Sequence, residues 1–318
     1  MQIIGPDMLL LGVEDPAEAA AFVHDYGLVR RSESPDRVVF EALDGTGLDI
    51  RRIDDPDLPP AVNDGPGLRE TIYGVADQAS LNAIAAELSK DRAVIRENAV
   101  VRSHDEDGYP IAFQLTKRHA IDSAPYRVNC PGSQPSRAAN QIAAIDDEHP
   151  LAYTLSHFVL FTRDREKAER FYAGRLGFRT VDIFTNLGPF MRPAGTNEHH
   201  TLFLIQADRL GMQHFAFHFA GANEVMKAGW NMMNKGHVSD WGPGRHILGS
   251  NWFWYFESPF GCLMEMDADM DLHDDSWVPR EMVADENTSQ TLVLQFKPKH
   301  SPATEARKKA AQAGGATA

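Results

Sequence analysis

Three residues in the second half of the chain have the types and positions of metal ligands. His157 and His214 each open a predicted strand, and Glu265 lies in the later predicted strand FGCLMEMDAD. Side chains alternate between the two faces of a strand, so Leu263, Glu265 and Asp267 share one face. If these strands are neighbours in one curved sheet, two imidazoles and one carboxylate converge inside it. Two His and one carboxylate with open positions beside them are typical of non-haem Fe(II) oxygenases.

An internal repeat supports this interpretation. The stretch MLLLGVEDPAEAAAFVHDYGLVRRSE from Met8 matches HFVLFTRDREKAERFYAGRLGFRTVD from His157 in its order of strand, helix and strand, and second units of this kind begin at Glu70 and His214. When the halves are aligned, the residues opposite the three candidate ligands are, in order, Met8, Glu70 and Ala112. The first half therefore keeps the framework without the ligands, which indicates that the fold does not need them.

The repeat predicts an α+β fold of two domains, each made of two βαβββ modules. We expect an N-terminal, metal-free domain over residues 1–135 and a C-terminal, metal-binding catalytic domain over residues 151–290. The polar stretch NCPGSQPSRAANQIAAIDD indicates a connector at 136–150. Residues 291–318 are predicted to be a mobile tail, since KHSPATEARKKAAQAGGATA offers little to bury.

Composition narrows the classes of partner. The chain of 318 residues is 43% apolar and 24% charged, as in a soluble protein of two globular domains. Its formal charge of −14 disfavours nucleic acid and anionic membranes as partners. Two cysteines, Cys130 and Cys262, cannot form a disulfide framework, and the first residues lack the features of a signal peptide. We therefore expect a cytoplasmic protein.

Further polar residues carry a family resemblance. Residues 156–270 resemble the catalytic domain of type I extradiol ring-cleaving dioxygenases, which belong to the vicinal oxygen chelate superfamily and include catechol 2,3-dioxygenases and dihydroxybiphenyl dioxygenases. The chain to about residue 290 resembles their two-domain, four-module plan. In the motif GRH, His246 is followed by Tyr255 nine residues later and by Glu265 ten residues after that, and His199 lies fifteen residues before His214. These spacings match the family.

The resemblance implies that His157, His214 and Glu265 hold Fe(II), or less often Mn(II). It implies a catechol-type substrate bound through both oxygens and cleaved by O2 beside the diol, which gives a muconic semialdehyde-type product in aromatic degradation. It also implies a homo-oligomer.

The resemblance further implies roles for three residues that are not ligands. His199 is expected to be the acid-base group, because imidazole can take a substrate proton and return it near neutral pH. His246 is expected to hydrogen-bond the substrate or oxygen, and Tyr255 to donate to the deprotonated substrate oxygen. His200 is assigned no role, because the next residue of a strand points to the opposite face.

Several alternatives stay open. A glyoxalase-like isomerase of the same superfamily would use the fold and a metal, and a metal-free binding protein would use the fold alone. His218 lies on the face of His214, but four strand residues span about 13 Å, too far for one ion. Arg192 and Arg245 are candidates either for binding a ring carboxylate or for structural ion pairs.

Overall fold

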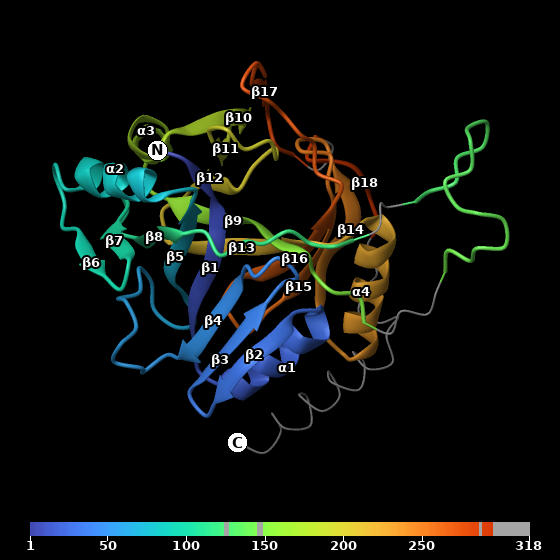
Figure 1. Ribbon diagram of the computed structural model, residues 1–318, viewed down its shortest axis with the longest axis horizontal. Helices are drawn as coiled ribbons and strands as arrows, with labels where there is room; N and C mark the ends of the chain where they lie inside the picture. Colours follow the sequence, from blue (N-terminus) through green and yellow to red (C-terminus); the bar gives the residue numbers. More distant parts are fainter. Residues whose placement is uncertain (124–126, 145–148, 286–287, 295–318) are drawn as a thin grey trace.

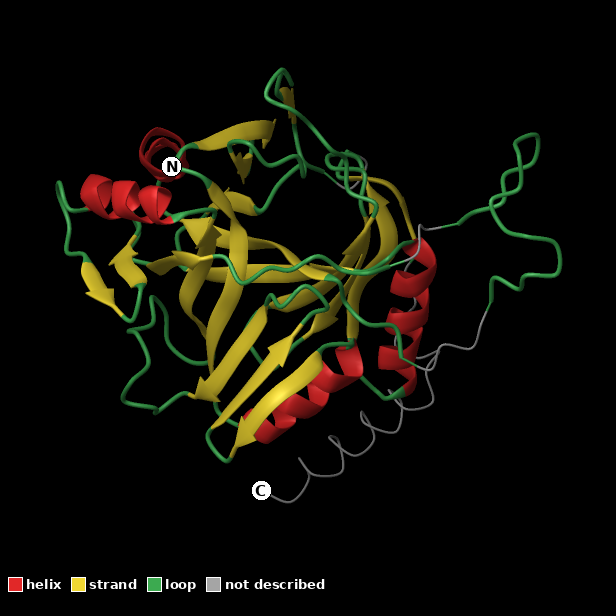
Figure 2. Cartoon of the chain, in the orientation of Figure 1, coloured by secondary structure: helices red, strands yellow, loops and turns green. Residues whose placement is uncertain are grey.

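The protein is built from two β-sheets with helices at the periphery (Figures 1 and 2). The computed structural model describes residues 1–123, 127–144, 149–285 and 288–294. One sheet, of eight strands, comes from the first half of the chain and the other, of ten strands, from the second half. This architecture confirms the predicted α+β class.

The first sheet has the strand order β2-β3-β4-β1-β5-β8-β7-β6. Its elements are β1 (Ile3–Val13), α1 (Pro16–Tyr26), β2 (Val29–Ser34), β3 (Arg37–Glu41), β4 (Gly47–Arg52), β5 (Gly67–Val75), α2 (Gln78–Leu88), β6 (Ile95–Glu97), β7 (Val100–His104) and β8 (Pro110–Leu115).

The second sheet has the order β17-β10-β11-β12-β9-β13-β16-β15-β14-β18. Its elements are β9 (Thr154–Thr162), α3 (Arg165–Leu176), β10 (Phe178–Phe184), β11 (Gly188–Pro193), β12 (Leu202–Gln206), β13 (Gly211–His218), α4 (Ala222–Asn234), β14 (Ser239–His246), β15 (Trp252–Glu257), β16 (Leu263–Ala268), β17 (Arg280–Met282) and β18 (Gln290–Val293).

Each half contains two βαβββ modules, as the repeat predicts. In every module the first strand pairs in parallel with the last, and the first strands of the two modules pair antiparallel. Acidic residues before the helices serve as N-caps: the Asp15 carboxylate accepts hydrogen bonds from two N–H groups of α1, and Asp164 accepts from one of α3. Gly27 and Gly177 end these helices at φ +117° and +74°, a conformation that favours glycine.

The strand registers of the two halves agree at the candidate ligands. In the second sheet Ala216 of β13 pairs with His157 on one side and with Glu265 on the other. In the first sheet Ile72 of β5 pairs with Met8 and Ala112 in the same way. The backbone that places the two outer ligands is thus repeated in the first half, with a thioether and a methyl group in their place.

The two halves share one hydrophobic core. A single cluster of buried side chains contains residues of both sheets, and helices pair across the halves, α1 with α4 and α2 with α3 (Figure 1). Tyr73 of β5 contacts Phe158 and Phe178 with ring centroids 6.1 and 6.0 Å apart. Two tyrosine hydroxyls also cross the boundary: Tyr26 of α1 donates to the carbonyl of Glu265, and Tyr109 contacts the backbone of Gly211.

Two predicted boundaries need correction. Residues 291–293 belong to β18, which pairs with β14, so the tail does not begin at 291. The composition of these few residues did not reveal their backbone hydrogen bonds. The remainder of the predicted tail, residues 295–318, lies outside the described residues. Between β8 and β9 the described residues contain no helix or strand, so the link between the sheets is longer than the predicted connector at 136–150.

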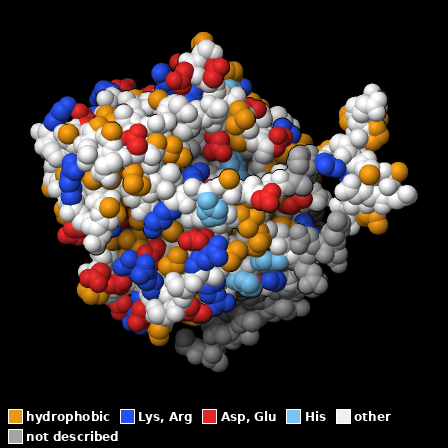
Figure 3. Space-filling model, in the orientation of Figure 1, with side chains coloured by type: hydrophobic (Ala, Val, Ile, Leu, Met, Phe, Trp, Pro, Cys, Tyr) orange, Lys and Arg blue, Asp and Glu red, His pale blue; other side chains and the backbone are white. Residues whose placement is uncertain are grey.

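No helix among the described residues is long and apolar enough to cross a membrane. On the face shown in Figure 3, lysine and arginine side chains are interspersed with acidic ones.

Arg118, in the link after β8, joins the halves through a buried ion network. Its Nη2 donates to the carbonyl of Pro6 at 2.7 Å, its Nη1 donates to Thr154 Oγ1 at 3.1 Å, and its Nε lies 3.4 Å from Asp7 Oδ1. The carboxylate of Asp44 lies 3.8 Å away. Asp7 and Asp44 are both buried.

Replacing Arg118 with Met is therefore expected to lower the free energy of unfolding by about 3–5 kcal/mol, because two buried carboxylates lose their cation. Urea denaturation of the full chain measures the change. Arg52→Gln is the matched control, since Arg52 pairs with exposed acids and solvent screens these charges, so its loss should change the free energy of unfolding far less. Equal effects of the two substitutions would contradict the structural role of Arg118.

Candidate metal centre and active site

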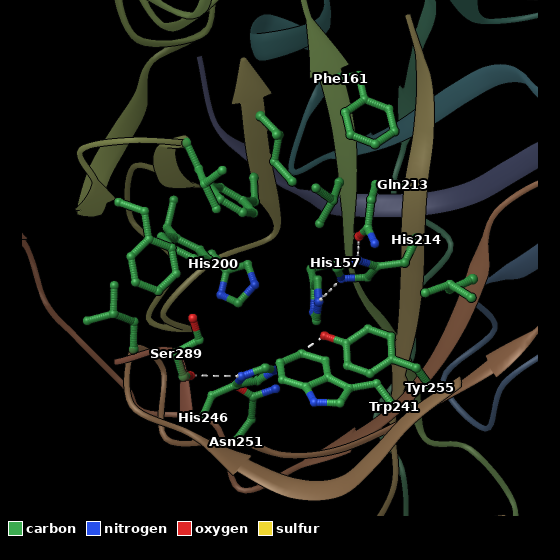
Figure 4. Close-up of a pocket in the computed structure, with 18 of the residues that line it drawn as sticks. His157, Phe161, His200, Gln213, His214, Trp241, His246, Asn251, Tyr255 and Ser289 are labelled. Atoms are coloured by element: carbon green, nitrogen blue, oxygen red, sulfur yellow. Dashed lines mark hydrogen bonds between the residues drawn. The ribbon is translucent and has the colours of Figure 1, made fainter. Parts of the chain in front are cut away.

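Three neighbouring strands bring His157 (β9), His214 (β13) and Glu265 (β16) together inside the second sheet. Figure 4 shows the side chains of His157 and His214 side by side. We call these three residues the His–His–Glu cluster. His157 Nε2 lies 3.1 Å from His214 Nε2 and 3.0 Å from Glu265 Oε2, and His214 Nε2 lies 3.2 Å from Glu265 Oε2. All three side chains are buried.

These separations fit a metal ion. Two ligand atoms that lie about 2.1 Å from an ion and at right angles to each other are about 3.0 Å apart. Three atoms with such mutual separations occupy one triangular face of an octahedron, which leaves the opposite face for other ligands. The donor set of two imidazoles and one carboxylate also suits a divalent transition metal.

Neighbouring side chains orient the two histidines. The Ser156 hydroxyl donates its proton to Asp267 Oδ2 at 2.9 Å. Ser156 Oγ is therefore an acceptor for the Nδ1–H of His157, also at 2.9 Å. The Nδ1 atom of His214 contacts the side-chain oxygen of Gln213. In both rings Nδ1 is the nitrogen that donates away from the cluster, so Nε2 faces the cluster and can bind a metal once it carries no proton. The sequence analysis did not identify Gln213; its role in orienting His214 is visible only in the structure.

The charges of the cluster hold a proton where a metal would bind. Burial lowers the pKa of His157, but the charges and hydrogen bonds of Glu265 and Asp267 outweigh burial and raise this pKa to about 9. Burial alone would raise the pKa of Glu265, yet the charge of His157 and its hydrogen bond outweigh burial and hold this pKa well below its usual value. Without a metal, His157 is therefore an imidazolium at neutral pH.

Metal affinity should consequently increase with pH. A divalent ion must displace the His157 proton below pH 9, so affinity is expected to rise from pH 7 to about 9 and then level off, with about one proton released per ion at pH 7. Titration of the metal-free full chain with Mn(II) in buffers of different ionisation enthalpy measures this release. Affinity that does not change with pH would contradict the assigned protonation.

The structure places the side chains of the adjacent histidines 199 and 200 differently from the sequence-based expectation. A cavity opens beside the His–His–Glu cluster, and we call it the main cavity. His199 is fully buried and does not line it; its Nε2 lies 2.8 Å from Asp182 Oδ2. His200 lines that cavity, and its ring centroid is 4.3 Å from that of His157. Both residues precede β12, which begins at Leu202, so the strand alternation used for the prediction does not apply to them. The spacing to His214 selected the member of the pair that does not line this cavity.

His199 instead determines which nitrogen of His200 carries the proton. The Asp182 carboxylate only accepts, so His199 Nε2 donates to it; burial lowers the pKa of His199, whose Nδ1 is then an acceptor. The Nδ1–H of His200, 2.9 Å from His199 Nδ1, donates to this acceptor. The lone pair of His200 Nε2 is left for the cavity. Burial and the nearby charge of His157 lower the pKa of His200 well below its usual value, which keeps it neutral.

His246 and Tyr255 lie on the other side of the cluster, as Figure 4 shows. His246 Nδ1 lies 3.3 Å from the carbonyl of Ser289, which can only accept, so this nitrogen carries the proton. His246 Nε2 then accepts from the Tyr255 hydroxyl at 3.2 Å. Burial and the charge of Glu265 raise the pKa of Tyr255 well above its usual value, so this hydroxyl stays a donor. The sequence did not identify Asn251, whose Nδ2 lies 3.4 Å from Glu265 Oε1.

Other candidates from the sequence lie outside the cluster. His218 Nδ1 is 2.8 Å from Asp267 Oδ1, so His218 supports the cluster from behind, in agreement with its exclusion as a ligand. The side chain of Arg192 is buried against the Thr196 carbonyl and Asp275, and Arg245 pairs with Asp269 on the surface. Both arginines therefore make structural ion pairs.

The main cavity opens from the cluster and has a volume of about 500 Å³. Its polar lining at the cluster includes His200, His246 and Tyr255. The remaining wall is mostly apolar, and within it the rings of Phe190 and Phe203 stack with centroids 4.0 Å apart. The apolar lining residues are Val159, Phe161, Phe184, Leu187, Phe190, Phe203, Ile205, Leu248 and Leu263. Such a cavity suits an aromatic ligand with one polar end directed at the cluster.

Comparisons with known proteins agree with this fold. Residues 154–266 match the family model described as the Glyoxalase/Bleomycin resistance protein/Dioxygenase superfamily. Metapyrocatechase 2 of Cupriavidus necator is 33% identical over 169 residues, 52% of this chain and 52% of that protein. The match therefore spans about half the length of this relative.

Two solved structures share nearly the whole architecture. The Mn(II)-bound glyoxalase of Novosphingobium aromaticivorans has a TM-score of 0.74 at 18% identity and covers 95% of this chain and 94% of its own. BphC, a halotolerant catechol dioxygenase, has a TM-score of 0.73 at 15% identity and covers 95% of this chain and 97% of its own. At these identities the likeness concerns the fold.

Proposed function

Because residues 154–266 match the family model of the Glyoxalase/Bleomycin resistance protein/Dioxygenase superfamily, we propose that this chain is a metal-dependent extradiol dioxygenase. Its substrates are a catechol-type aromatic diol and O2, and its product is a ring-opened, muconic semialdehyde-type compound of aromatic degradation. The observation that carries this proposal is the convergence of His200, His246 and Tyr255 on the His–His–Glu cluster at one end of a cavity with aromatic walls. The match to Metapyrocatechase 2 supports it.

We propose Fe(II), with Mn(II) as the less frequent alternative, as the metal that His157, His214 and Glu265 hold. When bound, such an ion is a Lewis acid that favours the ionised diol and brings the diol and O2 together. The cluster contributes two neutral imidazoles and one carboxylate, which leave the ion with a net positive charge.

His200 replaces His199 as the proposed acid-base residue. Its neutral imidazole directs the lone pair of Nε2 toward the cavity, where it can accept a proton from a diol hydroxyl. The imidazolium that forms keeps its Nδ1–H hydrogen bond to His199, which is itself bonded to Asp182. Hydrogen bonds from His199 and Arg280 lower the pKa of Asp182 to about 2 in spite of burial. The series of hydrogen bonds from His200 through His199 therefore ends at a carboxylate that stays ionised.

Tyr255 and His246 act on the other side of the substrate. The Tyr255 hydroxyl, which is protonated, can turn from His246 to donate to a substrate oxygen as negative charge develops there. His246 keeps its Nδ1–H on the Ser289 carbonyl, so its Nε2 is available as an acceptor for a substrate hydroxyl. The apolar wall excludes water from the remainder of the ring.

The second candidate function is a glyoxalase-like isomerase, which the likeness to the Mn(II)-bound glyoxalase favours. An isomerase consumes no O2. The deciding experiment is anaerobic loading of the full chain with Fe(II), addition of a catechol, and admission of oxygen. Oxygen uptake with a yellow ring-cleavage product supports the dioxygenase, whereas loaded protein that gives neither with a panel of catechols contradicts it.

The proposal includes a homo-oligomer in the cytoplasm. Both cysteines are free thiols, which suits a reducing compartment.

A further inference from the structure

One positive charge lies at the outer end of the main cavity. Arg209, in the turn between β12 and β13, is the only lysine or arginine among the described residues that line this cavity. It also lines a second hollow that shares Phe161, Gln213 and Leu263 with the first, so Arg209 marks the junction of the two. A ligand that extends outward from the cluster meets this guanidinium.

The side chain of Arg209 has no polar partner that would give it a structural role among the described residues. No hydrogen bond or ion pair joins its side chain to another residue in the described part of the chain, and its guanidinium carbon instead lies 4.4 Å from the centroid of the Phe161 ring. Asp240 lines the same cavity without forming an ion pair with it among the described residues. By contrast, the two arginines that the sequence offered for carboxylate binding, Arg192 and Arg245, already pair with acids.

The strand register gives the depth of this charge. His157, Val159 and Phe161 line the cavity in succession along β9. At a rise of about 3.3 Å per residue, the backbone of Phe161 lies about 13 Å from that of His157. The pairing of Phe161 with Gly211 places the turn that carries Arg209 at this outer level. Figure 4 shows Phe161 beyond Gln213 and His214 on the side away from Tyr255.

We propose that Arg209 binds a carboxylate on the substrate, which makes the substrate a catechol whose substituent ends in an acid several atoms from the diol. This inference rests on the proposed dioxygenase function. The net charge of −14 repels anions from the protein as a whole, so an acidic substrate needs a local cation at the entrance. The planar guanidinium group of arginine can donate two parallel hydrogen bonds to a carboxylate. The guanidinium of Arg209 packs over the Phe161 ring, which restricts its orientation.

The test compares two catechols that carry a three-carbon chain at the same ring position, one ending in a carboxylate and the other in a methyl group. Binding to the Fe(II)-loaded full chain is measured anaerobically by calorimetry, and cleavage by oxygen uptake. Arg209→Gln should weaken binding of the acid about tenfold and change that of the propyl compound less than twofold. Arg209→Lys should retain part of the preference. The matched control Arg170→Gln removes an exposed charge on α3 and should alter neither compound.

The outcomes separate the two proposals. Equal changes for both catechols in Arg209→Gln, or no preference of the wild-type protein for the acid, overturn the assignment of Arg209 while the dioxygenase function stands. Failure of the wild-type protein to bind or cleave either compound overturns the dioxygenase function, and the assignment of Arg209 with it.

Discussion

Replacing Glu265 with Ala is expected to abolish metal binding and ring cleavage while the fold stays largely intact. Glu265 supplies the only negative charge of the His–His–Glu cluster, and two imidazoles alone hold a divalent ion poorly. The Tyr26 hydroxyl is bonded to the backbone carbonyl of Glu265, so that tie between the halves survives the substitution. Metal analysis should show a fall from about one ion per chain to almost none, with an unchanged circular dichroism spectrum.

Glu70→Gln is the matched control, because Glu70 occupies the repeat position of His214 in the first half. Its carboxylate pairs with Arg102 at 3.1 Å, and no metal-binding cluster was found around it among the described residues. Metal content and ring cleavage should stay near wild type. Full metal content in Glu265→Ala, or a loss of metal and activity in step in Glu70→Gln, would show that the ligands lie elsewhere.

The second large effect is expected at His200. His200→Phe should keep the metal and still bind a catechol anaerobically, but kcat should fall roughly 10²- to 10⁴-fold because the acid-base group is gone. His199→Gln is the informative partner: its amide can accept from His200 Nδ1–H and donate to Asp182, as His199 does. We expect turnover within a few-fold of wild type for this variant.

The turnover of the two variants distinguishes the roles of the two histidines. If His199→Gln lost as much kcat as His200→Phe and binding stayed intact in both, the spacing-based assignment of His199 would be restored. Wild-type turnover in His200→Phe would remove the acid-base role from this position altogether.

The sequence predicted those features that depend on strand periodicity and on the repeat. The four modules and the neighbouring strands that bring His157, His214 and Glu265 together follow from apolar patterning and from side-chain alternation within regular strands. Alternation failed at His199 and His200 because a bend before β12 sets their directions. Spacing to a distant residue cannot resolve a shift of one position in an irregular segment.

Residues that act through a tertiary contact gave no periodic signal. Asn251 lies between β14 and β15 and contacts Glu265 only in the folded protein. Arg209 lies in a turn, and the position of its charge can be interpreted only when the cavity is known. Strand β18 was missed for a similar reason: its four residues form a strand by pairing with β14, and four residues are too few to show a clear alternating pattern.

The hydrogen bond from Tyr26 to the carbonyl of Glu265 has a consequence for the synthesis of the protein. The two residues are 239 positions apart, so α1 leaves the ribosome long before its partner exists. At about 5–20 residues per second, roughly 12–48 s separate the two. During this interval the first sheet can form, whereas the last metal ligand has not yet been made. An unfinished chain therefore has no complete metal site, and an ion can be bound only after β16 has been synthesised and has joined the surface formed earlier by the first half.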